Sequence, residues 1–128
     1  MKKKSTRRKS LTMDDVRALA MAMPDVEETT AYGMSAFKAG KKRLAGQPVQ
    51  RSDIEPNTLG VLVSFEERDR LLATRPDVYY LTEHYVNYPS VLVRLTKITK
   101  AELRELLGTA WAHAMERQRP AKKKRAQR

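Results

Sequence analysis

The sequence predicts an α+β fold, a two-layer sandwich in which helices cover one face of a mainly antiparallel sheet. Three observations support this prediction. Three segments have the apolar spacing of helices and a capping pair at their start, and the segments between them have the length of strands. Short connections join these elements in the order α-β-β-β-β-α-β-β-α. At 128 residues the chain is long enough for one domain with a single core.

Each predicted helix begins with a hydroxyl residue that is followed three positions later by an acidic one, as in a capping box. The three pairs are Thr12 with Asp15, Ser64 with Glu67, and Thr99 with Glu102. They predict helices near residues 13–23, 65–74 and 100–115. The third helix has the longest apolar pattern, and Trp111 shares its apolar face with Leu103 and Leu107. We therefore expect these three side chains to pack together under the sheet.

The segments between the helices predict strands, by their apolar content and by the turn residues that separate them. The predicted strands are residues 29–32, 36–39, 43–50, 59–63, 78–81 and 91–95. Gly40 and Lys41 have the composition of a hairpin turn between the second strand and the third. The last strand is apolar on both faces except at Arg94, which is typical of a strand in the middle of a sheet.

The net charge of +11 is distributed unevenly along the chain. Residues 1–10 carry +6 and residues 117–128 carry +7, whereas residues 11–116 hold all 15 acidic residues and sum to −2. Neither terminal segment has the apolar residues that could offset the entropy cost of ordering. We therefore expect one nearly neutral domain, residues 11–116, between two disordered basic tails.

The composition excludes several classes of site and of protein. The chain has no cysteine, which excludes thiolate nucleophiles, disulfides and cysteine metal ligands. No apolar run reaches the ~18 residues of a membrane span, and the basic N-terminus lacks the apolar stretch of a secretory signal. Neither a nucleophile elbow nor a glycine-rich phosphate loop is present. We expect a cytoplasmic monomer without membrane contact, catalytic residues, metal or cofactor.

The basic tails indicate a polyanionic partner. Lysine and arginine in mobile segments can neutralise phosphates and release counterions, which gives salt-sensitive binding without sequence preference. Solubility or an anionic membrane would also explain the charge, but neither tail has the apolar face of a membrane-binding helix. The candidate phosphate contacts in the tails are Lys2, Lys3, Lys4, Arg7, Arg8, Lys9, Lys122, Lys123, Lys124 and Arg125.

The predicted hairpin turn is a second candidate for phosphate binding. Four cations cluster around it, namely Lys38, Lys41, Lys42 and Arg43. A hairpin has the shape of a wing that can lie against a groove or a nucleic-acid backbone, and phosphate contacts need only charge and reach. The alternative is a solvated strand edge whose lysines prevent sheet-to-sheet aggregation.

An aromatic-rich stretch follows between residues 79 and 88. Its rings could stack on unpaired bases or line a small-molecule pocket. They could also be structural, half-buried and with their hydroxyls bonded locally. The candidate pocket residues are Tyr32, His84, Tyr85 and Tyr88. The alternative function is therefore a module that binds a small molecule or a protein through the groove near these rings.

Several strings in the sequence resemble the MmcQ/YjbR family. They are residues 24–33 (PDVEETTAYG), 66–69 (EERD), 80–85 (YLTEHY), 88–95 (YPSVLVRL) and the last helix from 102 to 111. In order and spacing, the resemblance covers roughly residues 12–116. It implies a frataxin-like or CyaY-like sandwich, described in the family as a double-wing arrangement, and a DNA-binding role without established catalysis. The expected partner is therefore DNA, with RNA as the alternative, and DNA binding would place the protein at the nucleoid.

Overall fold

The structure, a computed structural model, describes residues 10–31, 33–49 and 51–117. The tail candidates between Lys2 and Lys9 and between Lys122 and Arg125 lie outside these residues, as does Tyr32. In chain order the elements are α1 (Met13–Met21), β1 (Val26–Ala31), β2 (Met34–Ala39), β3 (Lys42–Gly46), β4 (Thr58–Leu62), α2 (Phe65–Thr74), β5 (Tyr79–Tyr80), the 3-10 helix η2 (Glu83–Tyr85), β6 (Ser90–Arg94) and α3 (Lys100–Arg117).

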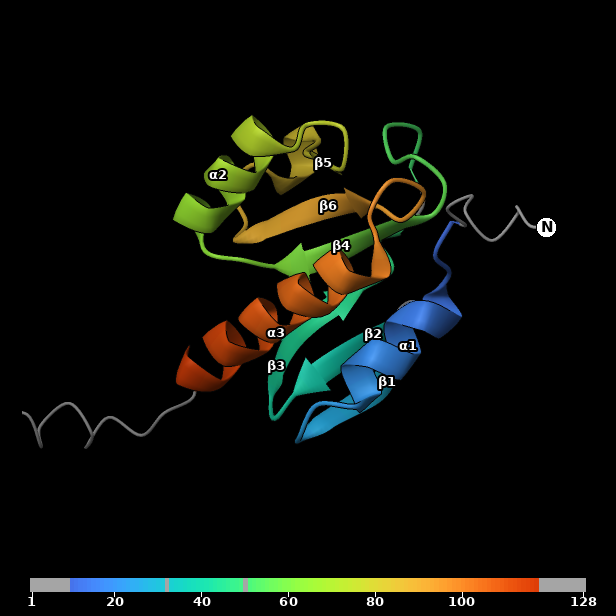
Figure 1. Ribbon diagram of the computed structural model, residues 1–128, viewed down its shortest axis with the longest axis vertical. Coiled ribbons are helices and arrows are strands. Elements are labelled where there is room, and N and C mark those ends of the chain that lie inside the picture. The colour runs from blue at the N-terminus through green and yellow to red at the C-terminus, as the bar shows by residue number, and fades with distance from the viewer. Residues whose placement is uncertain (1–9, 32, 50, 118–128) are drawn as a thin grey trace, which may run out of the picture.

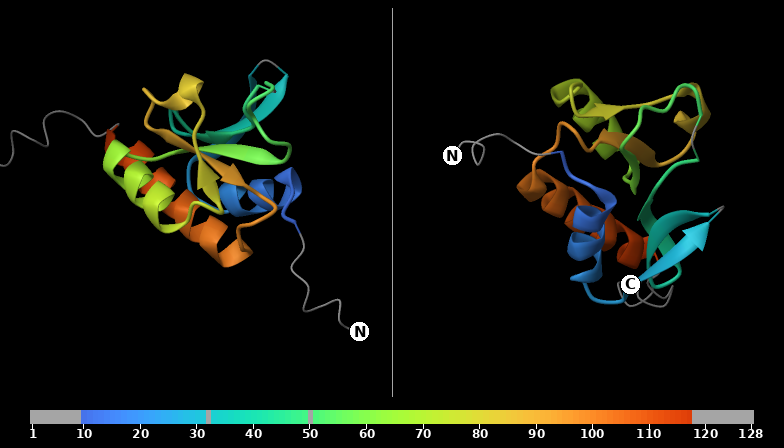
Figure 2. Two further views of the ribbon diagram at one scale, coloured as in Figure 1. Left: turned by 90° about the horizontal axis from the view of Figure 1, so that it is seen from above. Right: turned by 90° about the vertical axis from the view of Figure 1, so that its right-hand side faces the viewer.

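The strands form one six-stranded sheet in the order β1-β2-β3-β4-β6-β5, and every neighbouring pair is antiparallel. All three helices cover the same face of the sheet (Figures 1 and 2). The helix α3 packs on β3 and β4, α1 packs on α3 and β1, and α2 packs on β5 and β6. The predicted α+β class, two-layer arrangement and element order are confirmed. The strand β6 lies between β4 and β5, as its apolar faces predict.

The boundaries of several strands differ from the prediction. The strand β1 begins earlier, directly after Asp25, whose φ of 64° makes the turn that ends the preceding loop. The strand β3 ends at Gly46 rather than at residue 50, because Pro48 has no N–H to donate to a sheet ladder. The helix η2 was not predicted from the sequence.

The main core fills the space between the helices and the sheet. Its largest fully buried side chains include Phe37, Leu59, Leu103 and Leu107. Trp111 differs from the prediction, because it is only partly buried at the margin of this core. Its indole Nε1 donates a hydrogen bond to the carbonyl of Pro24 at 2.7 Å. The reason is angular, since residue 111 lies about 100° around the helix from the fully buried residue before it, at the edge of the apolar stripe.

The predicted caps hold the starts of the helices. At α3 the box is complete, because the Thr99 N–H donates to Glu102 Oε1 at 3.0 Å and the Glu102 N–H donates to Thr99 Oγ1 at 3.1 Å. At α2 the Glu67 N–H donates to Ser64 Oγ at 3.0 Å. These bonds satisfy N–H groups that have no partner within their own helix.

Candidate functional site

A pocket of about 300 Å³ lies beside the face of the sheet that the helices leave open, which we call the outer face. Gly46 of β3 and Gly60 of β4 stand directly opposite each other there. Neither has a side chain, and the partly exposed backbone of Gly60 lies at the floor of the pocket, whereas Gly46 is buried. The segment that contains η2 lies on the same side of the sheet (Figure 2, left). The lining residues are Lys42, Arg43, Leu44, Ala45, Gly46, Pro48, Gly60, Val61, Leu62, Tyr85, Tyr88, Pro89 and Ser90.

A β-bulge places Arg43 at this pocket. In the β2–β3 pair Lys38 faces Arg43 and Phe37 faces Ala45, so Leu44 is an extra residue with no partner. Leu44 turns into the main core and is fully buried, whereas Arg43 stays exposed on the outer face.

The guanidinium group of Arg43 lies over the backbone of Gly46. A Cβ atom added at Gly46 would be only 2.4 Å from Arg43 Nη2. Within the described residues the Arg43 guanidinium forms no ion pair with a carboxylate. The glycine therefore leaves room for the Arg43 guanidinium at the edge of the pocket.

Three of the predicted pocket residues form one aromatic cluster. The ring of His84 lies 4.9 Å from the ring of Tyr85 and 5.8 Å from that of Tyr88, centroid to centroid. Tyr85 and Tyr88 line the pocket, whereas His84 packs against them from outside. Tyr88 is 52% exposed and Tyr85 is half-buried.

Burial and the charges of Arg43, Arg51 and Asp53 act on the pKa of the Tyr85 phenol. Burial raises the pKa of Tyr85, and the positive charges of Arg43 and Arg51 act against this rise. Because the net shift is upward from a value near 10, the phenol stays protonated at neutral pH. Tyr85 can therefore donate a hydrogen bond to a ligand in the pocket.

The other aromatic residues of this stretch have structural roles. The Tyr80 hydroxyl lies 2.6 Å from Thr58 Oγ1 and accepts a hydrogen bond from the Glu55 N–H at 2.9 Å. The guanidinium of Arg94 lies 4.4 Å from the centroid of the Tyr80 ring and pairs with the Glu55 carboxylate at 2.9 Å. Tyr79 is buried. Tyr79 and Tyr80 therefore fit the structural alternative, whereas Tyr85 and Tyr88 face a pocket.

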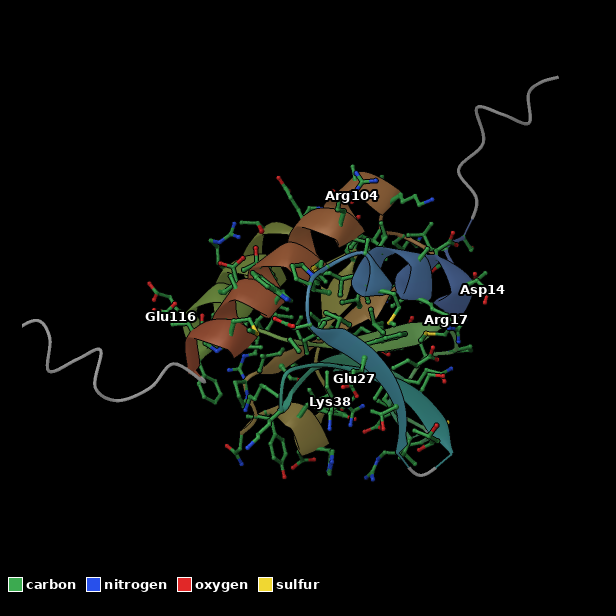
Figure 3. The ribbon with its side chains drawn as sticks, turned by 90° about the horizontal axis from the view of Figure 1, so that it is seen from below. Asp14, Arg17, Glu27, Lys38, Arg104 and Glu116 are labelled. Atoms are coloured by element: carbon green, nitrogen blue, oxygen red, sulfur yellow. The ribbon has the colours of Figure 1, made fainter. Side chains whose placement is uncertain are left out.

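The predicted hairpin is present, with Gly40 and Lys41 between β2 and β3. Lys38 faces Arg43 across the β2–β3 pair, and Glu27 of β1 stands opposite Lys38 (Figure 3). Lys42 and Arg43 line the pocket together with the tyrosines. The two candidate sites that the sequence suggested separately, the basic hairpin and the aromatic stretch, thus share one pocket. Gly46 and Gly60 are not predictable from the sequence as site residues, because only strand pairing shows that they stand opposite each other.

The hairpin turn also lies near the last turns of α3. The Gly40 N–H donates to the carbonyl of Asp25 at 3.1 Å, and Trp111 bonds the carbonyl of the preceding Pro24. One loop therefore contacts both the hairpin turn and α3. The chain leaves α3 after Arg117, toward the basic residues 118–128, at this end of the domain.

Elsewhere the described residues offer weaker candidates. A groove between α2 and α3 contains cations, but Arg70 is paired with Glu67 and Arg75 with Glu102. Among the described residues, no three His, Asp or Glu side chains are grouped so that they could hold a metal ion. No helix in the same part of the chain is long and apolar enough to cross a bilayer.

Comparisons with known proteins give the chain's relatives. Residues 21–113 match the family model described as YjbR. Uncharacterized proteins of Mycobacterium tuberculosis and Mycobacterium bovis are each 35% identical to the chain over 113 residues, which cover 78% of this chain and 85% of theirs. The crystal structure of the Deinococcus radiodurans protein DR2400, with a domain of the DUF419 family model, is similar at a TM-score of 0.72 and 20% identity. That match covers 91% of this chain and 88% of the other, and it shows a shared fold.

Proposed function

The chain belongs to the YjbR family, and we propose that it binds DNA with little or no sequence specificity. The observation that supports this most strongly is the Arg43 guanidinium, without a carboxylate partner in the described residues and next to Lys42 on the β2–β3 hairpin. A cation that no acidic side chain neutralises is available for an external anion. Phosphate is the anion that a DNA backbone presents along its whole length.

The charge distribution supports the same proposal. Residues 11–116 sum to −2, so this domain has little long-range attraction for a polyanion, and its affinity must come from a local cluster. The hairpin supplies that cluster, and the terminal segments supply the rest of the positive charge. Contacts to phosphate carry no sequence information, which is why we propose binding without specificity. In this proposal the protein acts as a monomer by binding alone, without catalysis, in the cytoplasm at the nucleoid, and RNA is the alternative polyanion.

A second candidate function is a small-molecule-binding module. The observation that favours it is the pocket itself, whose volume of about 300 Å³ lies at the lower end of the range for small-ligand sites. The same arginine that could bind a phosphate of DNA could bind an acidic group of a small ligand.

Fluorescence anisotropy with a labelled DNA duplex at several salt concentrations tests the main proposal. If the terminal segments engage about 5–7 phosphates, log affinity should fall against log salt with a slope of about −4.5 to −6. Deleting residues 1–10 and 117–128 should flatten that slope and remove most of the binding. The double variant Lys42→Glu and Arg43→Glu in the full chain should weaken binding for all duplex sequences alike and lower the slope by about 2.

The matched control is Lys100→Glu with Arg104→Glu, which changes the net charge equally but on α3, in the other layer (Figure 3 labels Arg104). The control should keep most of the affinity. Equal losses in both double variants would show that net charge, and not the hairpin, determines binding. Absence of binding by the unmodified chain at low salt would refute DNA binding and favour the small-molecule function.

A further inference from the structure

We propose that the pocket on the outer face holds one unpaired nucleotide of a DNA strand, with its base against Tyr85 and Tyr88 and its phosphate at Arg43. This inference rests on the proposed function and adds to it a preference for single-stranded DNA. It assigns separate tasks to the two parts of the site. The hairpin contacts the backbone of any DNA, and the pocket accepts only a base that has left the duplex.

The floor of the pocket suits a flat ring. Gly46 and Gly60 pair directly. The Arg43 guanidinium covers Gly46, so the backbone that a ligand can reach lies at Gly60, which is partly exposed. The space above Gly60 is not filled by another side chain or by backbone. The nearest atom to a Cβ atom added there would be the Gly46 carbonyl oxygen at 3.5 Å, an ordinary contact distance. A planar base can therefore approach the sheet where a residue with a side chain would stop it.

The walls supply the aromatic surface that binds bases without sequence preference. The rings of Tyr85 and Tyr88 are 6.4 Å apart with an angle of 66° between their planes, so they are not stacked face to face on each other. Tyr88 lines the pocket and is 52% exposed, so its ring is accessible to a ligand. Every base has a π face, so stacking on these rings would tolerate any of the four.

The basic residues that line the pocket favour an anionic ligand. Lys42 and Arg43 line the same pocket as the tyrosines, and Arg43 has no carboxylate partner within the described residues. A neutral apolar ligand would leave the Arg43 guanidinium on this face without an anionic partner. The terminal segments of the chain are poor occupants, because residues 1–10 and 117–128 carry +6 and +7 and would be repelled by the rim. Aromatic walls beside cations match a nucleotide, which combines a planar base with a phosphate.

The occupant is part of a strand rather than a free nucleotide, since the cations continue beyond the pocket. Lys38, which is half-buried and has Glu27 opposite it on β1, faces Arg43 across the β2–β3 pair and would be the second cation for a neighbouring phosphate of the same strand. A base inside a duplex is stacked and paired, and it must leave that stack before it can enter such a pocket. The site therefore favours single strands, frayed ends and mismatched bases.

The experiment compares three probes on the full chain: a single strand of eight thymidines, a blunt duplex of similar length and thymidine monophosphate. Two variants remove the site. Gly60→Val fills the floor, and Tyr88→Ala removes an exposed ring. The matched control is Gly108→Ala in α3, where an added Cβ atom meets nothing within 4 Å. Circular dichroism verifies that each variant is folded.

Both variants should weaken single-strand binding about tenfold and leave duplex binding nearly unchanged, while the Gly108→Ala control binds all probes normally. In a ¹⁵N-labelled chain the single strand should shift the backbone amides of Gly60 and Tyr88. The indole N–H of Trp111, bonded to Pro24 in the helical layer, should not shift.

The possible failures are distinguishable. Duplex binding together with unchanged single-strand affinity in both variants would overturn the pocket assignment and leave the proposed function intact. Thymidine monophosphate binding as tightly as the single strand would identify a free nucleotide as the ligand and overturn the strand assignment. Failure to bind either DNA at low salt would refute both proposals. A dimer in sedimentation that Tyr88→Ala dissociates would identify a second copy as the occupant.

Discussion

Leu92→Ala tests whether the outer face has a small core of its own under the aromatic stretch. Leu92 is fully buried, yet it does not belong to the cluster between the helices and the sheet. It faces Gly60 on one side and Tyr80 on the other, and its side chain therefore lies on the outer face. If this second core supports the pocket, truncating Leu92 should destabilise the whole domain.

The magnitude follows from the surroundings of the side chain. Truncating a buried leucine to alanine costs about 2–5 kcal/mol, and the cost rises with the volume of cavity that remains. The Cδ2 atom of Leu92 is 3.9 Å from the position that a Cβ atom would take at Gly60, so the new space would open toward the pocket. Because water can fill a space that is open to the pocket, little empty cavity remains after the truncation. The cost in unfolding free energy therefore lies toward the lower end of that range. We expect about 2–3 kcal/mol for Leu92→Ala and about 4 kcal/mol for Leu103→Ala in the closed main core.

Urea unfolding followed by far-ultraviolet circular dichroism measures both variants, and equal m-values would show that the same surface is exposed on unfolding. A loss below about 1 kcal/mol for Leu92→Ala would show that the outer face contributes no core. A loss equal to that of Leu103→Ala would show that the space stays closed, and our account of the pocket would then be wrong.

Two further predictions concern α3. The backbone hydrogen bond from Thr99, with a further contribution from Arg75, lowers the pKa of Glu102 below its usual value of 4.5. The pKa of Glu102 is lower in the folded chain than in the unfolded chain, so the ionised carboxylate stabilises the fold at pH values above its unfolded pKa. This contribution is lost as the pH falls through the folded pKa. The unfolding free energies of the unmodified chain and Glu102→Gln should therefore differ most near neutral pH and converge as the pH falls through the lowered pKa of Glu102. For Trp111→Phe, which keeps a ring but loses the bond to Pro24, urea unfolding should show a loss of about 1 kcal/mol; no loss would mean that water replaces the bond at no cost.

The sequence predicts what depends on near neighbours in the chain. The capping pairs Ser64 with Glu67 and Thr99 with Glu102 form the predicted hydrogen bonds, because three residues of helix fix their geometry. The central position of β6 follows from its own apolar residues. The order of the elements then leaves few ways to cover one sheet with three helices.

Some features depend on how one helix or strand is oriented against another, and the sequence alone does not show this. Trp111 has the spacing of a core residue, but only the packing of α3 shows that it lies at the margin of the apolar stripe. The predicted length of β3 was wrong because hydrophobic content does not show where pairing with β4 stops. Both errors concern contacts between segments far apart in the chain.

By itself the sequence determined the α+β class, the element order, the helix starts and the two groups of residues, basic and aromatic, that the site contains. Only the tertiary structure decided that these groups meet. The bulge at Leu44 keeps Arg43 on the outer face, and the register of β3 against β4 places Gly46 opposite Gly60. Strand register arises from pairing across the whole sheet, and a shift by one residue would turn every side chain to the other face. A pocket that depends on register therefore has no local signal in the sequence.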